Sequence, residues 1–391
     1  MEFKRLGDIA TFINGYAFKP EQWGNEGLPI IRIQNLTNSS KEINYYNGNI
    51  NEKYLVKKGD ILIAWSASLG VHEWYGEDAA LNQHIFKVVF DKITIDKKYF
   101  KYMVSVALNT ALKYLHGSTM KHLTKKYFDD IKIPVPSYAQ QLKIRKTLDS
   151  SYSLIINRQS QIAALDELKK SVFLEMFGNP SSNKHNYPIK PLVYFYKDSK
   201  EAVKCGPFGS ALKKDEYTNS GIPVWNMDNI SKKNEFIDQP NLFVSNEKAV
   251  KLQNYNVRNG DIIISRAGTV GKMAVVNSNY EESLISTNLI RLRLNSQLKP
   301  EFLVWLIKIF GDRVCRMRTG SDGAFTHMNT SVLNSIQFPY PPVEEQEKFI
   351  DFLGVINKQK QKMLDALQIQ EELYQSLLQK AFKGALFQEK V

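Results

Sequence analysis

The sequence predicts an α+β protein that consists of two copies of one α/β domain, each followed by a long helix. Three observations predict this organisation. Motifs of the first half of the chain return in the same order in the second half, at offsets that grow from 194 to 205 residues. After the last motif of each copy comes a proline-free run of good helix formers, 138–177 and 343–382. The length of 391 residues also favours two or three domains over one.

The repeated motifs keep both their order and their residue pattern. The pairs are Gly27–Leu36 with Gly221–Ile230, Lys58–Ile63 with Asn259–Ile264, Ile85–Phe90 with Leu289–Leu294, and Ile133–Pro136 with Phe338–Pro341. Small changes of offset are what loop insertions produce in two diverging copies. Since these offsets far exceed the roughly 20–50 residues of solenoid repeats, we expect two domains, which a pseudo-two-fold axis can relate.

Within each copy, short β-rich runs separated by Gly, Asn and Ser turns precede a helix. The elements expected are strands over 60–65 and 84–90 with a helix over 96–115 in the first copy, and strands over 261–264 and 289–293 with a helix over 299–317 in the second. Pro300 suits the first turn of the second of these helices.

The two long helical segments share one apolar heptad phase, which favours a coiled coil. The residues expected to pack between the helices are Leu148, Ile155, Ile162, Leu165, Val172, Met176, Leu353, Ile356, Met363, Leu367 and Leu377. Other positions of this seam are polar, namely Ser151, Arg158, Lys169, Lys360 and Gln370. Polar seam residues can fix the register of a coiled coil, but they also leave open an assignment as two ordinary core helices.

The net charge is +12, from 52 Lys and Arg against 40 Asp and Glu. Such a balance suits a polyanionic partner, because each neutralised phosphate releases counterions; solvated surface charge is the alternative. No long uncharged apolar run predicts a membrane span. The N-terminal sequence lacks the features of a secretory signal, and two cysteines, Cys205 and Cys315, cannot build a disulfide framework. We therefore expect a cytoplasmic protein.

Several motif fragments fail to complete a catalytic or metal site. The segment 266–272 is similar to a phosphate loop, but Arg266 replaces its first glycine and Met273 replaces its Ser or Thr. The histidines and cysteines lack metal-ligand spacing. Carboxylate pairs at Asp129–Asp130 and Glu344–Glu345 are expected at helix starts, where they stabilise the helix dipole. The sequence therefore predicts neither intrinsic catalysis nor a bound metal.

Polar and basic residues in loops are the candidates for a nucleic-acid surface. Arg and Lys can hold phosphates, while Arg, Asn, Gln, Ser and Thr can read base edges. For each candidate, the alternative is a structural turn or a solvated face. The candidates are Arg32, Gln34, Ser66, Ser68, Lys121, Lys125, Lys126, Asn226, Arg266, Thr269, Arg316 and Arg318.

Over essentially its whole length, the chain resembles the specificity (S) subunits of type I restriction-modification systems. The resemblance is carried by the duplicated Gly-Asp-Ile strands and by the paired Pro-x-Pro sequences, which Gln141 or Glu345–Gln346 follow. A long helix follows each Pro-x-Pro sequence, and it ends in Phe173–Gly178 in the first copy and in Leu378–Gly384 in the second.

This resemblance implies that each variable half is a target-recognition domain that reads one half of a bipartite site in double-stranded DNA. The two helices would pack antiparallel as a coiled-coil spacer that separates and joins the domains. The expected boundaries are 1–137 and 179–341 for the recognition domains, 138–178 and 342–384 for the spacer helices, and 385–391 for a C-terminal tail.

The resemblance also implies two methyltransferase (M) subunits as partners, joined by restriction (R) subunits. S-adenosylmethionine would be bound by M, and ATP with Mg²⁺ by R, so this chain itself would bind no cofactor. Two alternatives stay open: a non-catalytic coiled-coil scaffold that binds protein or RNA, and a solitary or phage-encoded specificity-like protein that redirects a host system.

Overall fold

The computed structural model describes residues 2–387, except 38–41, 66–68, 116–124, 181, 198–200, 209–210, 267–271, 317–329 and 335. For 112–115, 311–316 and 332 it describes the backbone alone. The chain divides into two compact units. The first unit is Met1–Gln161 with Met363–Val391, and the second unit is Ile162–Lys362.

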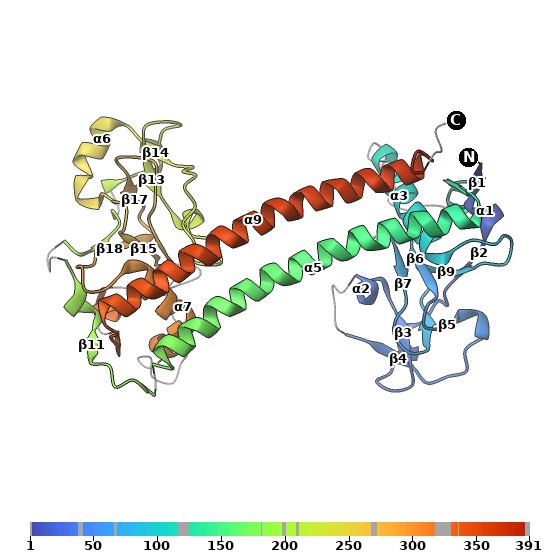
Figure 1. Ribbon diagram of the computed structural model, residues 1–391, viewed down its shortest axis with the longest axis horizontal. Coiled ribbons are helices and arrows are strands. Elements are labelled where there is room, and N and C mark those ends of the chain that lie inside the picture. The colour runs from blue at the N-terminus through green and yellow to red at the C-terminus, as the bar shows by residue number, and fades with distance from the viewer. Residues whose placement is uncertain are drawn as a thin grey trace. The chain divides into compact units, whose positions relative to one another are not determined.

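The first unit contains two four-stranded sheets and a two-stranded one (Figure 1). The first sheet has the spatial order β2 (Thr11–Asn14), β9 (Ile85–Val89), β6 (Ile61–Ala64) and β7 (Gly70–Glu73). The second sheet has the order β4 (Asn44–Tyr46), β3 (Leu28–Ile31), β8 (Ala79–Leu81) and β5 (Leu55–Val56). The two-stranded sheet pairs β1 (Phe3–Arg5) with β10 (Lys132–Pro134). Only one of these pairs, β3 with β8, is parallel. The helices are α1 (Leu6–Ile9), α2 (Ile33–Leu36), α3 (Lys97–Leu115) and α4 (Lys125–Asp129).

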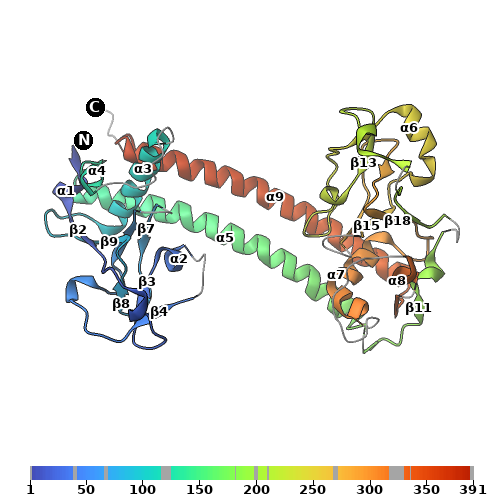
Figure 2. The same ribbon diagram turned by 180° about the vertical axis from the view of Figure 1, so that it is seen from behind.

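The second unit repeats this topology (Figure 2), except that its second sheet has no strand corresponding to β5 among the described residues. Its strands, in spatial order, are β12 (Val203–Cys205), β18 (Leu289–Leu292), β15 (Ile262–Ser265) and β16 (Met273–Val275); β14 (Phe243–Val244), β13 (Ile222–Trp225) and β17 (Leu284–Ile285); and β11 (Ile189–Pro191) with β19 (Gln337–Pro339). The parallel pair is again the matching one, β13 with β17. Its helices are α6 (Asn246–Lys251), α7 (Pro300–Arg316) and α8 (Thr330–Asn334). The predicted duplication is therefore confirmed in strand order and strand direction.

The long helices α5 (Tyr138–Phe177) and α9 (Val343–Phe382) each contribute one part to each unit. In the first unit, the ring of Tyr152 on α5 lies 5.6 Å from that of Tyr374 on α9. In the second unit, Phe173 near the end of α5 lies 5.1 Å from Phe349 near the start of α9. Early residues of one helix thus meet late residues of the other, and the pair is antiparallel.

The helix ends belong to the cores of the two domains. Leu148 lies in one core with α3, and Leu353 lies in the other with α7. Phe173 and Phe177, which the heptad pattern did not single out, are buried with Leu353. Of the residues predicted to pack between the helices, Leu148, Ile155 and Leu353 are buried, and those that are half-buried are Ile162, Leu165, Val172, Met176, Ile356, Met363, Leu367 and Leu377.

A buried glutamine joins each long helix to the shorter helix of its domain. The Oε1 atom of Gln141 accepts from the backbone N–H of Asp96 at 2.9 Å, just before α3 begins. Its Nε2 atom donates to the carbonyl of Pro136 at 2.9 Å. Gln346 binds Lys299 and Pro341 in the same way, also at 2.9 Å each. These glutamines satisfy backbone groups that would otherwise be unpaired at a helix start.

The helix over 96–115 begins one residue later than predicted, because the side chain of Asp96 is its cap. Its Oδ1 atom accepts from the N–H of Tyr99 at 2.8 Å, which is the role of an N-cap carboxylate. Pro300 opens α7, as predicted, and Glu344 and Glu345 lie in the first turn of α9.

The placement of Asp129–Asp130 at a helix start was wrong. Asp129 ends the short helix α4, and Asp130 follows it. Carboxylates are unfavourable at a helix C-terminus, but Asp130 lies 3.7 Å from the guanidinium of Arg5. The buried ring of Phe128 sets the direction of this helix.

We expect Gln346→Met to lower the free energy of unfolding of the second unit by about 2–4 kcal/mol, because each buried polar group left without a partner costs about 1–3 kcal/mol. The amide of Gln346 also donates to the carbonyl of Gln297 at 3.2 Å, so three backbone groups lose a partner. Urea unfolding of the full chain measures the change. Gln359→Met, at an exposed position of α9, is the control and should stay within about 0.5 kcal/mol. Equal effects of the two changes would contradict the structural role of Gln346.

Candidate nucleic-acid interface

Two of the candidate residues, Arg32 and Asn226, occupy the same place in the two domains. Each follows an inner strand of its sheet, β3 or β13, and caps a short helical turn. The backbone N–H of Arg32 donates to Oδ1 of Asn35 at 3.0 Å, and that of Asn226 donates to Oδ1 of Asn229 at 2.9 Å. Sequence reasoning missed the two asparagines that fold these turns, although the alignment of the copies pairs them.

The side chains of Arg32 and Asn226 make further contacts near their turns. The guanidinium of Arg32 lies 4.8 Å over the ring of Trp23, and its Nη1 atom donates to Oδ1 of Asn44 at 2.9 Å. The amide of Asn226 donates to Oδ1 of Asn241 at 2.7 Å. Gln34 is half-buried on α2. These contacts fix the orientation of Arg32, whereas those of Asn226 favour a structural turn.

Arg266 follows β15 and lies over an aromatic ring. Its guanidinium carbon is 4.5 Å from the ring centre of Phe208, a residue whose side chain is 56% exposed. Its Nη1 atom donates to the carbonyl of Thr287 at 3.3 Å. Two residues before this ring, Gly206 lies against the backbone of Ser286, because a Cβ atom there would lie 1.9 Å from the carbonyl oxygen of Ser286. A stacked, planar guanidinium is well suited to a bidentate contact with guanine.

The remaining candidates fall into two groups. Lys125 and Lys126 are exposed at the start of α4, where their charges suit contacts with phosphate. Arg316 is the last residue of α7 and is described by its backbone alone. The candidates that lie outside the described residues are Ser66, Ser68, Lys121, Thr269 and Arg318.

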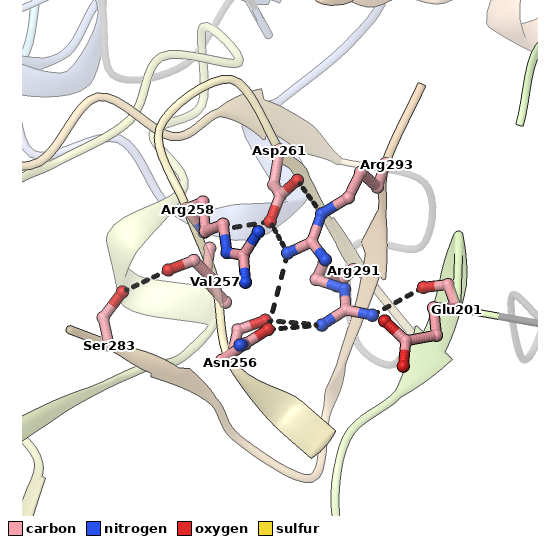
Figure 3. Close-up of polar contacts among 8 residues, drawn as sticks. All are labelled: Glu201, Asn256, Val257, Arg258, Asp261, Ser283, Arg291 and Arg293. Carbon is pink, nitrogen blue, oxygen red and sulfur yellow. Dashed lines mark hydrogen bonds and ion pairs between the residues drawn. The ribbon is translucent and has the colours of Figure 1, made fainter. Parts of the chain in front are cut away.

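The arginines of β18 and of the residue after it are held inside the second domain (Figure 3). Arg291 is 2% exposed and donates from Nη1 to the carbonyl of Asn256 at 2.6 Å and from Nη2 to that of Glu201 at 2.6 Å. Burial lowers the pKa of Arg291. Arg293 contacts both carboxylate oxygens of Asp261, at 2.8 and 2.7 Å, and this hydrogen bonding raises the pKa of Arg293. These cations stabilise the domain and do not face a ligand.

The Gly-Asp motif of each copy has the same structural role. Gly59 and Gly260 both have φ of +87°, a left-handed conformation that favours glycine. The aspartates that follow accept from the backbone N–H groups of Lys57 and Arg258, at 2.9 Å in each case. The motif thus closes the turn before β6 and before β15.

A cation on the neighbouring strand completes this arrangement in both copies. Lys87 of β9 donates to the carbonyl of Leu55 at 2.5 Å and lies 3.5 Å from Asp60. Lys87 corresponds to Arg291, because each donates to the carbonyl of a residue at the same place in its copy, Leu55 in the first and Asn256 in the second. The strongest signature of the sequence therefore maintains the fold, and it is not itself a candidate for contacts with a ligand.

The described part of the chain has neither a metal-binding cluster nor a membrane-spanning helix. No group of three His, Cys, Asp or Glu side chains is placed to hold a metal ion. No helix there combines the length and the apolar character needed to cross a membrane.

The sequence matches the family described as "Type I restriction modification DNA specificity domain" over residues 1–166 and 206–373. It is 23% identical over 415 residues to the type I restriction enzyme EcoBI specificity subunit of Escherichia coli, covering 97% of this chain and 85% of that subunit. It is 24% identical over 374 residues to the MjaVIII specificity subunit of Methanocaldococcus jannaschii, covering 91% and 86% of the two chains.

A solved structure shares the fold. It comes from work on complex assembly and conformational transition of the type I R-M system, and its chain superimposes with a TM-score of 0.62 at 15% identity, covering 98% of both chains. The predicted fold class is thus confirmed, and so is the resemblance stated from the motifs.

We expect Asp261→Asn to lower the free energy of unfolding by about 3–5 kcal/mol, because it breaks one partner of a buried ion pair. Asp261 and Arg293 are 4% and 12% exposed at their side chains. The base preference of any DNA bound under native conditions should stay unchanged, since neither group reaches the surface. Urea unfolding and selection from random duplexes measure the two effects. Asp215→Asn, at an exposed position, is the control; an altered base preference with unchanged stability would overturn the structural assignment.

Proposed function

The chain belongs to the family of type I restriction-modification DNA specificity domains, and on that basis we propose that it selects the DNA target of such a system. Each unit would read one half of a bipartite site in double-stranded DNA. The observation that carries this proposal is the repeat of one strand order in both units, each of which contains a match to the family. The chain thus offers two related modules for two half-sites.

The antiparallel helices α5 and α9 would set the distance between the half-sites. Each has 40 residues, and at about 1.5 Å per residue such a helix measures roughly 60 Å. A turn of B-DNA measures about 34 Å, so the helix length matches nearly two turns. Related modules on a paired helical spacer suit a target with approximate two-fold symmetry.

The readout would rest on the loops that bear stacked arginines. Each unit holds one such group, Arg32 over Trp23 in the first and Arg266 over Phe208 in the second. Because stacking already restricts the rotamers of the arginine, less side-chain entropy is lost when the arginine binds DNA. Lys125 and Lys126 would contact phosphate and add affinity without selecting bases.

The chain would act with methyltransferase and restriction subunits in the cytoplasm. Two M subunits would match the two modules, and they would bind S-adenosylmethionine, while R subunits would bind ATP and Mg²⁺. Exposed apolar side chains on the helix pair of the first unit support protein docking there, since such residues mark interaction surfaces. They are Leu154, Ile156, Ile369 and Leu373.

A coiled-coil scaffold without sequence-specific DNA binding is the competing function, and salt dependence separates the two. For DNA binding we expect the affinity for duplex DNA to fall by about 10³-fold or more between 50 and 200 mM salt, as contacts with several phosphates require. Selection from random duplexes should then enrich two unlike half-sites with a gap of constant length. A flat salt dependence, or no enrichment, would favour the scaffold.

We expect Arg266→Ala to weaken binding to the selected target by about 1–3 kcal/mol and to relax the preference at one position of one half-site. Phe208→Leu should cause a smaller loss at the same position, because it removes the ring on which Arg266 lies. Lys126→Ala is the control for a phosphate contact and should weaken all sequences equally. Fluorescence anisotropy with target and single-substitution duplexes measures all three. A uniform loss for Arg266→Ala would instead assign that residue to the DNA backbone.

A further inference from the structure

A cavity of about 350 Å³ lies in the second unit, where α5, α7 and α9 meet the turn around Asn234. Charged side chains dominate its lining, which includes Asp166, Lys169, Lys233, Glu235, Trp305 and Lys308. None of these residues is among the candidates for base reading. The DNA-reading role of the chain therefore does not explain the cavity.

One carboxylate of the lining lies close to three ammonium groups, two from the lining itself and one from Lys360, which is not part of it. Asp166 accepts from Lys360 at 2.6 Å, and it lies 3.7 Å from the Nζ atom of Lys169 and 3.9 Å from that of Lys233. Lys169 and Lys360 are 4% and 9% exposed. Burial is the main reason why the pKa of Lys169 is lowered. Positive charge thus exceeds negative charge where water cannot fully solvate it.

Lys308 adds a fourth ammonium group. It lies on α7 with its Nζ atom 4.6 Å from the ring centre of Trp305, and among the described residues it forms no ion pair within 4.0 Å. Lys308 is exposed at the rim of the lining, and partial desolvation by its neighbours lowers the pKa of its ammonium group. The other carboxylates of the lining, Glu167 and Glu235, are exposed, as Lys233 and Lys308 are. Glu235 partly offsets the charge of Lys308, whose pKa it raises.

The first unit builds the same helix junction without these lysines. Alignment of α5 with α9 and of α3 with α7 gives the counterparts: Tyr374 for Lys169, Ile155 for Lys360, Tyr152 for Asn357, and Ser105 for Lys308. The rings of Tyr152 and Tyr374 lie 5.6 Å apart where the second unit has Asn357 hydrogen-bonded to Lys169 at 2.5 Å. The fold therefore does not require the lysines, and burying them is costly.

A second cavity of about 540 Å³ adjoins the first and shares Trp305, Val304 and Asn357 with it. Apolar side chains line its far side, among them Phe236, Ile350 and Leu353. The two cavities together offer positive charge at one end and apolar surface at the other, within the size range of small-molecule sites.

We propose that three lysines of the cavity lining (Lys169, Lys233 and Lys308) bind the phosphate group of a small phosphate ester whose apolar or aromatic body occupies the adjoining cavity, while Lys360 stays bound to Asp166. Several ammonium groups around one oxyanion make charge-assisted hydrogen bonds that a single surface lysine cannot match. The ligand would also supply the negative charge that the protein lacks at this site.

Isothermal titration calorimetry of the full chain at constant ionic strength tests this, with inorganic phosphate and adenosine monophosphate as probes against chloride. We expect one saturable site per chain and tighter binding of adenosine monophosphate than of phosphate. Lys308→Met should weaken both by about tenfold or more, because a hydrogen bond to a charged group is lost. Lys233→Met should act in the same direction, and since Lys233 is exposed it does not put folding at risk. Lys358→Met, an exposed position of α9 outside the cavity lining, is the matched control.

The apo protein provides a second readout. Because Lys308 is exposed and forms no ion pair within 4.0 Å among the described residues, the melting temperature of Lys308→Met without phosphate should stay close to that of the unaltered chain, and its increase with phosphate should be lost. Absence of saturable binding, or equal binding by the Lys308→Met and Lys358→Met variants, overturns the site. Equal affinity for phosphate and adenosine monophosphate overturns the role of the adjoining cavity. If neither probe binds but duplex DNA binding depends on Lys308, these lysines contact the DNA backbone and the small-molecule proposal is wrong.

Discussion

The junction at Gln141 and Gln346 is the constraint on which the rest of the structure depends. Each glutamine is almost fully buried. The side-chain amide of each forms hydrogen bonds with backbone groups at the start of α3 or α7 and in the Pro-x-Pro sequence. A buried amide has few geometries that satisfy all its partners, so the long helix leaves its domain in one direction. The fold of a domain thus becomes coupled to the orientation of its helix, and a mispaired junction would leave several backbone groups unsatisfied at once.

The duplication separates what maintains the fold from what can vary. Positions that keep their role in both copies hold turns and junctions: the glycine and aspartate before β6 and β15, the cation of β9 or β18, and the asparagines Asn35 and Asn229. Their hydrogen bonds are directed at backbone atoms, which do not depend on the identity of neighbouring side chains. Loops attached to such turns can change their side chains without loss of the strand order.

Much of the fold could be predicted from the sequence, and less of the candidate site. The limits of α5 and α9 follow from the heptad pattern and the absence of proline. Periodicity could not show that Phe173 and Phe177 enter a domain core, because a helix end has neighbours from other elements. Residue chemistry selected Asn226 and Arg266 alike, yet the amide of Asn226 is used within its own turn while Arg266 lies on an exposed ring. Which partner a polar group has is a tertiary property, and a single sequence does not contain it.

Charge shows the same limit at a larger scale. A net charge of +12 favours a polyanionic partner. The net charge does not show which cationic side chains can contact such a partner and which are used inside the protein. Arg291 and Arg293 are used inside a domain, whereas Lys169 and Lys360 are buried in a helix seam around a single carboxylate. The first group is engaged in hydrogen bonds within its domain and stabilises the protein. The second group is not fully compensated, and the other copy of the domain is built without it. An excess of buried charge that the fold does not need is evidence for a ligand, which a count of lysines and arginines is not.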